Sequence, residues 1–189
     1  GIHFWGDLAQ QRRFLELVRR YGESHAKTLF DMALDARTLT LEQITKHNIA
    51  CDLQTSGHLT LAAKPSDLIW MREEADTLAR TMNYPNARVL SAAEAFAKVA
   101  SDGFHGALLD EDGGHLHPLN YALGLAEAAR KMGVALYDNS RVTAVGGERG
   151  VTARTAAGVV RARFGVLACD ALLGNLEPSI AGRIMPVAN

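Results

Sequence analysis

The 189-residue sequence has only two cysteines, Cys51 and Cys169, and no long apolar run. Two cysteines so far apart do not form the dense cysteine framework of small secreted proteins, so we expect reduced thiols and a cytoplasmic location. The first residues hold neither a basic cluster nor a continuous apolar region, so no signal peptide is predicted. No apolar stretch approaches the roughly 18 residues of a membrane-spanning helix, so no membrane span is predicted.

Charge of one sign is not concentrated anywhere in the chain. The sequence has 20 basic and 21 acidic residues and a net charge of -1. Binding to nucleic acid or to an anionic membrane requires a concentrated basic face. We therefore expect no nucleic-acid partner. The hydrophobic share, 48%, is ordinary for a globular protein and allows one substantial core or two small ones.

Helical periodicity predominates in the first half of the chain. Helices are predicted over residues 7–21, 24–47, 66–82 and 91–100. Asp7 is the expected cap of the first helix, and Ser91 with Glu94 forms a capping box for the last. A hairpin is predicted from residues 51–53 and 58–62, which flank a Thr-Ser-Gly turn, and a strand over 104–109.

The second half is predicted to contain a helix, a buried strand, a meander and a second buried strand. His117 and Pro118 suit the start of the helix, and Gly133 its end. Its expected buried face consists of Leu119, Ala122, Leu123, Ala126, Ala129 and Met132. Residues 134–137 and 164–168 carry no charge, which is typical of strands covered on both faces. Between them, the runs 142–145, 151–155 and 159–163 alternate and are separated by glycines.

These elements predict an α+β (mixed α/β) fold with helices, antiparallel strands and a β-meander. Both ends differ from ordinary termini. The chain begins Gly-Ile-His-Phe-Trp without a methionine, and residues 184–187 resemble the approach to another strand. We therefore expect the chain to be a piece of a longer protein.

Several motifs carry a family resemblance. The run from Gly114 to Leu125, G-H-L-H-P-L-N-Y-A-L-G-L, is followed by a helix ending at Gly133-Val134. Shorter motifs on both sides of this run add support. The upstream ones are R-Y-G, K-T-L-F-D and H-N-I-A-C-D, and the downstream ones are S-R-V-T-A-V and V-L-A-C-D. Together these resemble the FAD-dependent amine and D-amino-acid oxidase (DAO) superfamily, and most of all its gamma-glutamylputrescine oxidase-like members.

The resemblance implies an FAD-dependent oxidoreductase that oxidises the C–N bond of an amine or amino acid by hydride transfer to flavin. Residues 1–112 would form a substrate-binding portion, and 113–189 part of the FAD-binding domain. In the family, the segments matching Val142 and Ala168 pass close to the cofactor. The resemblance thus implies Val142 and Ala168 as cofactor contacts.

One departure from the family limits what this chain does alone. Family members begin with a G-x-G-x-x-G turn, whose backbone amides hold the pyrophosphate. No such motif occurs here, and the glycines of 146–150 have the wrong spacing. We therefore expect these residues alone to bind no FAD and to be inactive. Apolar surface left open by the missing parts predicts self-association.

His115 and His117 are the candidate site residues, since they point to one side of an extended segment. Either would serve as a proton acceptor near substrate, or both would bind a metal together with His105. The structural alternative is a helix cap and hydrogen-bonded loop histidines. The neighbouring acidic residues 110–112 are interpreted as a solvated turn, so no metal site is predicted.

Two other functions compete with the flavoenzyme interpretation. One is a stand-alone, non-enzymatic binding or interaction domain, metal-assisted through the same histidines. The other is a degenerate homologue that has lost its upstream glycines. The reading frame around these residues distinguishes the three hypotheses.

Overall fold

The computed structural model describes residues 2–3 and 12–184, and for 2–3 and 12–15 it describes the backbone alone. The predicted cap Asp7 and most of the two terminal segments discussed above lie outside these residues. Two compact units are present, Gly1–Val134 and Ala135–Asn189. From the sequence, we expect the boundary between a substrate-binding portion and an FAD-binding portion at residues 112/113. The boundary between the two compact units does not test that assignment of roles, which stays a prediction.

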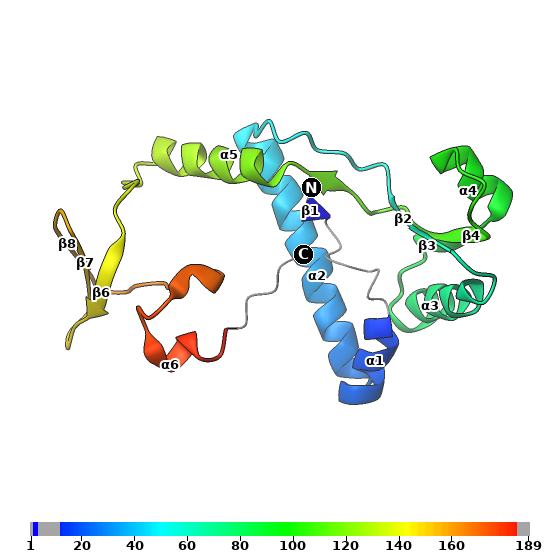
Figure 1. Cartoon of the computed structure of the whole chain (residues 1–189), viewed down its shortest axis with the longest axis horizontal. Helices are drawn as coiled ribbons and strands as arrows, with labels where there is room; N and C mark the ends of the chain where they lie inside the picture. The colour runs from blue at the N-terminus through cyan, green and yellow to red at the C-terminus, as the bar shows by residue number, and fades with distance from the viewer. Residues whose placement is uncertain (1, 4–11, 185–189) are drawn as a thin grey trace. The chain divides into compact units, whose positions relative to one another are not determined.

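A three-stranded antiparallel sheet forms one core of the first unit. Its order is β2 (His58–Leu61), β4 (Gly106–Asp110), β3 (Ala87–Ser91). Every residue of β4 is buried. Side chains alternate along a strand, so α3 (Asp67–Thr81) packs on the face of Leu108 and α4 (Ala92–Val99) on the opposite face (Figure 1).

The long helix α2 (Glu23–His47) links this core to a second one. It follows α1 (Arg12–Tyr21), and its 25 residues span about 37 Å at 1.5 Å per residue. Its first half places Ala26 and Phe30 in the sheet core. Near its end, Ile44 packs with Cys51 and Leu116 in the second cluster.

The predicted hairpin is wrong. Residues 58–61 pair with β4, and residue Gln54 forms an isolated bridge with His115. Strand β3 was not predicted either, because Pro85 and Asn86 indicate a turn at that point. Both differences have one cause: the apolar β4, distant in sequence, offers a better partner than the local segment does.

Helix α5 (Pro118–Lys131) forms as predicted, but it turns a different face inward. Tyr121 and Leu125 pack against the second cluster, and Ala128 is buried. From the predicted buried face, Leu123 is 59% exposed. Preceding α5, β5 (His115–Leu116) pairs with β1 (Ile2–His3).

The second unit contains the predicted meander. Strands β6 (Val142–Gly146), β7 (Val151–Thr155) and β8 (Val159–Ala162) lie in sequence order and are antiparallel. Two short helical segments follow, η2 (Asp170–Leu173) and α6 (Pro178–Ala181). With the small sheets of the first unit, this confirms the mixed α and antiparallel β fold class.

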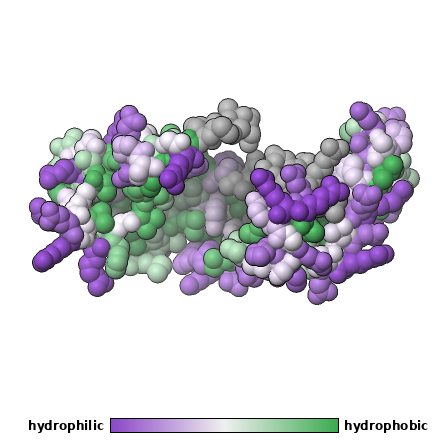
Figure 2. Space-filling view, turned by 90° about the horizontal axis from the view of Figure 1, so that it is seen from below, coloured by the Kyte–Doolittle hydropathy of each residue, from purple (hydrophilic) through white to green (hydrophobic). Residues whose placement is uncertain are grey.

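The two predicted buried strands do not form. Residues 134–137 and 164–168 have no regular secondary structure, and Val166 is 88% exposed. A strand covered on both faces needs hydrogen-bonded neighbours and a layer on each side. The described residues supply neither for these segments. Figure 2 shows hydrophobic surface in the left part of the view, on the side where Figure 1 labels β6 to β8.

Candidate functional site

The histidine segment lies between the sheet of the first unit and α5. His115 and His117 are both exposed, and Leu116 between them is 2% exposed and part of the second cluster. Because alternate residues of an extended chain point to opposite sides, the two imidazoles share one side, as the sequence indicated. The two histidines therefore lie on the same exposed side of the segment.

His117 is a helix cap. Its Nδ1 accepts a hydrogen bond of 3.3 Å from the amide of Asn120, and Pro118 follows at the first helical position. The Asn120 side chain in turn donates to Asp52 at 3.3 Å. This confirms the predicted capping role. It also assigns Nδ1 as the acceptor atom, so Nε2 is the nitrogen of His117 left to meet a ligand.

His115 is held through its backbone. Its amide donates to Gln54 and its carbonyl accepts from Gln54, each at 2.9 Å. On its other side it lies opposite His3 in the β1–β5 pair. These bonds fix the position of the backbone and leave the imidazole on the exposed side. A catalytic role for His115 stays a prediction.

The structure does not bring the third histidine of the metal hypothesis to this place. His105 precedes β4 and its amide donates to Ala62 at 2.9 Å, whereas His115 follows the other end of β4. Within residues 12–184 no three side chains of the types that bind metals converge. The geometry of the described chain therefore gives this alternative no support.

The acidic residues before the histidines are not all part of a solvated turn, which corrects the interpretation above. Asp110 is 3% exposed, and the hydroxyl of Tyr84 donates to its Oδ1 at 2.5 Å. Burial raises the pKa of Asp110 despite the opposing effect of that bond, and burial also raises the pKa of Tyr84. One signal could have revealed this burial: Asp110 shares the strand face of Leu108.

The two predicted cofactor contacts lie in the second unit. Val142 begins β6 and lines an apolar cleft of about 480 Å³ with Leu136 and Tyr137, and a second cleft of about 530 Å³ with Cys169. Ala168 is exposed and precedes Cys169 in an irregular segment. Their cofactor role stays a prediction. Both cysteines are free thiols.

The N-termini of α2, α3, α4 and α5 do not fit the phosphates of FAD. A pyrophosphate needs free amides at a helix N-terminus. Helices α2, α3 and α4 each carry an acidic residue in the first turn, which repels an anion, and α5 begins with a proline, which has no amide hydrogen. We therefore derive no chemical step through FAD from these residues. Nor does any described helix have the length and apolarity to cross a membrane.

Comparison with known proteins identifies relatives over almost the whole chain. The family profile of FAD dependent oxidoreductases (DAO) matches residues 4–189. Gamma-glutamylputrescine oxidoreductase of Escherichia coli is 36% identical over 171 residues, which cover 90% of this chain and 40% of that protein. The probable oxidoreductase OrdL of Haemophilus influenzae is 34% identical, over 87% of this chain and 38% of its own.

Solved structures agree on the fold. Glycine oxidase from Geobacillus kaustophilus superposes with a TM-score of 0.64 at 23% identity, over 78% of this chain and 42% of that one. Glycine oxidase from Bacillus cereus gives a TM-score of 0.65 at 16% identity. The chain spans about two fifths of the length of the curated relatives it matches. On the match over residues 4–189, the chain belongs to the FAD-dependent oxidoreductase (DAO) family.

Proposed function

We propose that this chain is part of an FAD-dependent oxidoreductase that oxidises the C–N bond of a small amine or amino acid. The observation that carries the proposal is the family match over residues 4–189. The 36% identity to gamma-glutamylputrescine oxidoreductase supports an amine substrate in particular. In such enzymes the flavin performs the redox chemistry, and the protein binds and orients the substrate.

Within this proposal the chain has two roles. Residues 1–112 belong to the substrate-binding portion, and residues 113–189 to part of the FAD-binding domain. Val142 and Ala168 contact the cofactor there, and the clefts beside Val142 support that position as a place for a flat ring. His115 and His117 face the substrate side. The phosphates are held by residues outside this chain, and the enzyme works in the cytoplasm.

The test is to express the whole reading frame that contains these residues and to record its visible spectrum. We expect bound flavin, whose absorbance is bleached anaerobically by an amine substrate and restored by an oxidant. A panel of amines and amino acids, with a carboxylic acid of matched size as control, identifies the substrate class. Purification without flavin, from cells that supply it, would refute the proposal and favour a non-enzymatic binding domain.

A further inference from the structure

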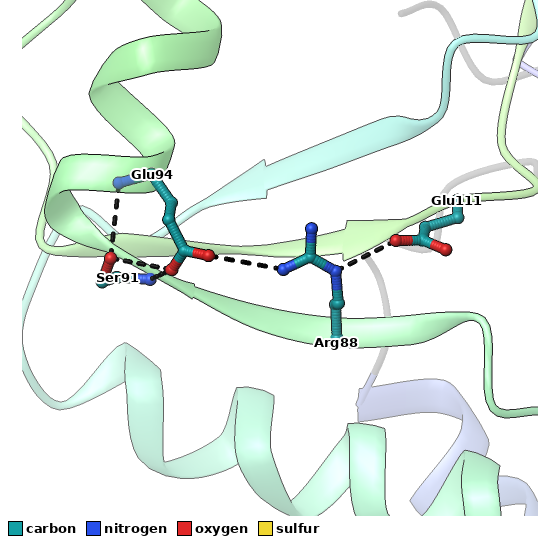
Figure 3. Close-up of polar contacts among 4 residues, drawn as sticks. All are labelled: Arg88, Ser91, Glu94 and Glu111. Carbon is teal, nitrogen blue, oxygen red and sulfur yellow. Dashed lines mark hydrogen bonds and ion pairs between the residues drawn. The ribbon is translucent and has the colours of Figure 1, made fainter.

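Three consecutive acidic residues, Asp110, Glu111 and Asp112, each have a side-chain partner elsewhere in the first unit. Tyr84, which follows α3, donates to Asp110 at 2.5 Å. From β3, Arg88 contacts Glu111 at 3.0 Å and also reaches Glu94, as Figure 3 shows. We call these three residues the acidic anchor.

The last residue of the anchor has two partners. Asn86 donates to Asp112 Oδ2 at 2.7 Å, and Arg37 of α2 lies 4.0 Å from Asp112 Oδ1. The amide of Asp112 also donates to Asp110 Oδ1 at 3.2 Å. Contacts from α2, from the connection between α3 and β3, and from β3 thus meet on one short stretch.

The contacts of the acidic anchor contribute unequally to its stability. The Arg88–Glu111 pair is about half exposed on both sides, so water and salt weaken it. Asp110 is almost fully buried, and its bond to Tyr84 is short. Losing a partner inside the protein costs more than losing one at the surface. Asp110 is therefore the residue on which the anchor depends most.

The backbone beyond the anchor leads directly to the histidines. The Gly113 amide donates to Asp110 O at 3.2 Å, and the Gly113 carbonyl accepts from Gly57 at 3.1 Å. His115 then pairs with Gln54, and the His117 amide donates to Cys51 O at 2.7 Å. Between Asp110 and His117 the chain has little freedom to change direction.

We infer that Tyr84 and the acidic anchor position the exposed face of His115 and His117 for a small polar substrate. This inference rests on the proposed function for the identity of that substrate. Tyr84, Asp110 and Asp112 touch no ligand in this account. They are positioning residues, which act by fixing the backbone that carries the two imidazoles.

The test begins with Tyr84→Phe, which removes the hydroxyl but keeps the ring that packs edge-on against Phe30 at 5.4 Å. Tyr21→Phe, the same change at an exposed tyrosine of the first unit, is the matched control. Hydrogen exchange in the 189-residue chain reads the backbone directly. We expect the amides of Asp112 and Gly113 to exchange roughly tenfold faster in Tyr84→Phe alone, as the loss of one hydrogen bond implies.

The functional readout uses the enzyme from the whole reading frame. We expect Tyr84→Phe to raise KM for the amine several-fold or to lower kcat, with the flavin spectrum unchanged. Asp110→Asn, which keeps an acceptor for Tyr84, should restore most of the activity lost in Asp110→Ala. A purely structural role would lower the melting temperature of the variants and leave kcat and KM unaltered.

Each outcome decides a different statement. Unchanged exchange at Asp112 and Gly113 in Tyr84→Phe overturns the anchor. Faster exchange with unchanged kcat and KM overturns the positioning role. If the whole protein lacks flavin, the proposed function fails, and the anchor is then judged by exchange at Asp112 and Gly113 and by the NMR chemical shifts of the His115 and His117 ring protons at one fixed pH. Ring shifts that change in Tyr84→Phe but not in Tyr21→Phe support the positioning of the imidazoles, and ring shifts that stay the same in Tyr84→Phe overturn it.

Discussion

At the scale of single residues, Glu74 is a carboxyl group buried in the first unit without a hydrogen-bond partner among the described residues. It lies on α3 between Met71 and Leu78, is 1% exposed, and neither carboxylate oxygen has a hydrogen-bond partner. Burial disfavours the charged form and raises its pKa from 4.5 to about 7. The protonated form is thus the one that suits the folded protein.

Glu74 predicts a specific dependence of stability on pH. Because the folded pKa is above the unfolded one, its stabilising contribution is complete below pH 4.5 and is lost as pH rises through about 7. The loss amounts to at most about 3 kcal/mol at 1.36 kcal/mol per pKa unit. Urea unfolding at pH 5 and pH 8 should show most of this fall in the unmutated chain and a smaller one in Glu74→Gln. Glu73→Gln, an exposed neighbour, should keep the full slope, and equal slopes in all three proteins would contradict the account.

The surroundings of Gly113 leave no room for a side chain. A Cβ at this position would lie 2.5 Å from Cβ and 2.6 Å from the backbone nitrogen of His58. Backbone atoms cannot move aside as a flexible side chain does, so we expect Gly113→Ala to destabilise the protein by about 1–3 kcal/mol. Gly103→Ala is the control, because the nearest atom to its added Cβ is 3.9 Å away. Chemical denaturation of the two variants measures the difference in stability. Similar midpoints would contradict the prediction and show that His58 and β2 shift to make room for the added methyl group.

At the scale of elements, the start of α4 was predictable in detail. Ser91 accepts a hydrogen bond from the amide of Glu94, and the Glu94 carboxylate accepts one from the amide of Ser91. Figure 3 shows the same carboxylate reaching Arg88. These bonds lower the pKa of Glu94, with the Ser91 amide as the largest cause. A four-residue pattern in the sequence is enough to specify the capping box.

The capping box gives a testable stability difference. Ser91→Ala removes the cap oxygen and should lower the free energy of unfolding by about 1 kcal/mol. Ser91→Thr keeps the hydroxyl and suits the end of β3, so it should lose much less. Thermal unfolding followed by circular dichroism compares the two. Equal melting temperatures would mean that packing of Ala95, not the cap, holds α4 in place.

Helix α5 shows what periodicity cannot decide. Apolar residues occur on more than one side of it, so the helical period alone fits more than one inward face. The second cluster, formed by α2 and the 49–53 segment, selects the side of Tyr121 and Leu125. A helix that is apolar on several sides is typical of one buried between layers. The exposed Leu119 and Leu123 are consistent with a further layer in the whole protein.

At the scale of the whole molecule, large apolar side chains remain on the surface of both units. In the second unit the most exposed are Phe164, Val166 and Leu172. Soluble monomers rarely expose contiguous apolar patches of large area. In family members more than twice as long, further polypeptide is available to cover such segments.

This surface predicts concentration-dependent self-association of the 189-residue chain. Replacing both Val166 and Leu172 by Asp should reduce this self-association, because burying a charged side chain between two copies costs free energy. Sedimentation velocity at several concentrations measures the association. Glu148→Gln, an exposed polar change in the same unit, should leave it unchanged. A chain that stays monomeric at every concentration would contradict the expected role of the apolar segments.

The sequence by itself determined the local features of this protein. The cap of α5 at His117, its end at Gly133, the capping box of α4 and the glycine-separated meander depend on residues close together in the chain. Such signals act over a few residues, so no distant partner is needed to read them. Family membership was also visible there, because the motif from Gly114 to Leu125 is continuous.

Only the tertiary structure decided which strands pair and which polar groups are buried. The segment 58–61 pairs with β4 and not with the segment 51–53. Asp110 is an interior residue because Tyr84 and the flanking strands β2 and β3 surround it. Conversely, residues 134–137 and 164–168 stayed without strand partners despite a strand-like pattern. Strand pairing and desolvation are long-range properties, since their free energy depends on neighbours that sequence distance does not specify.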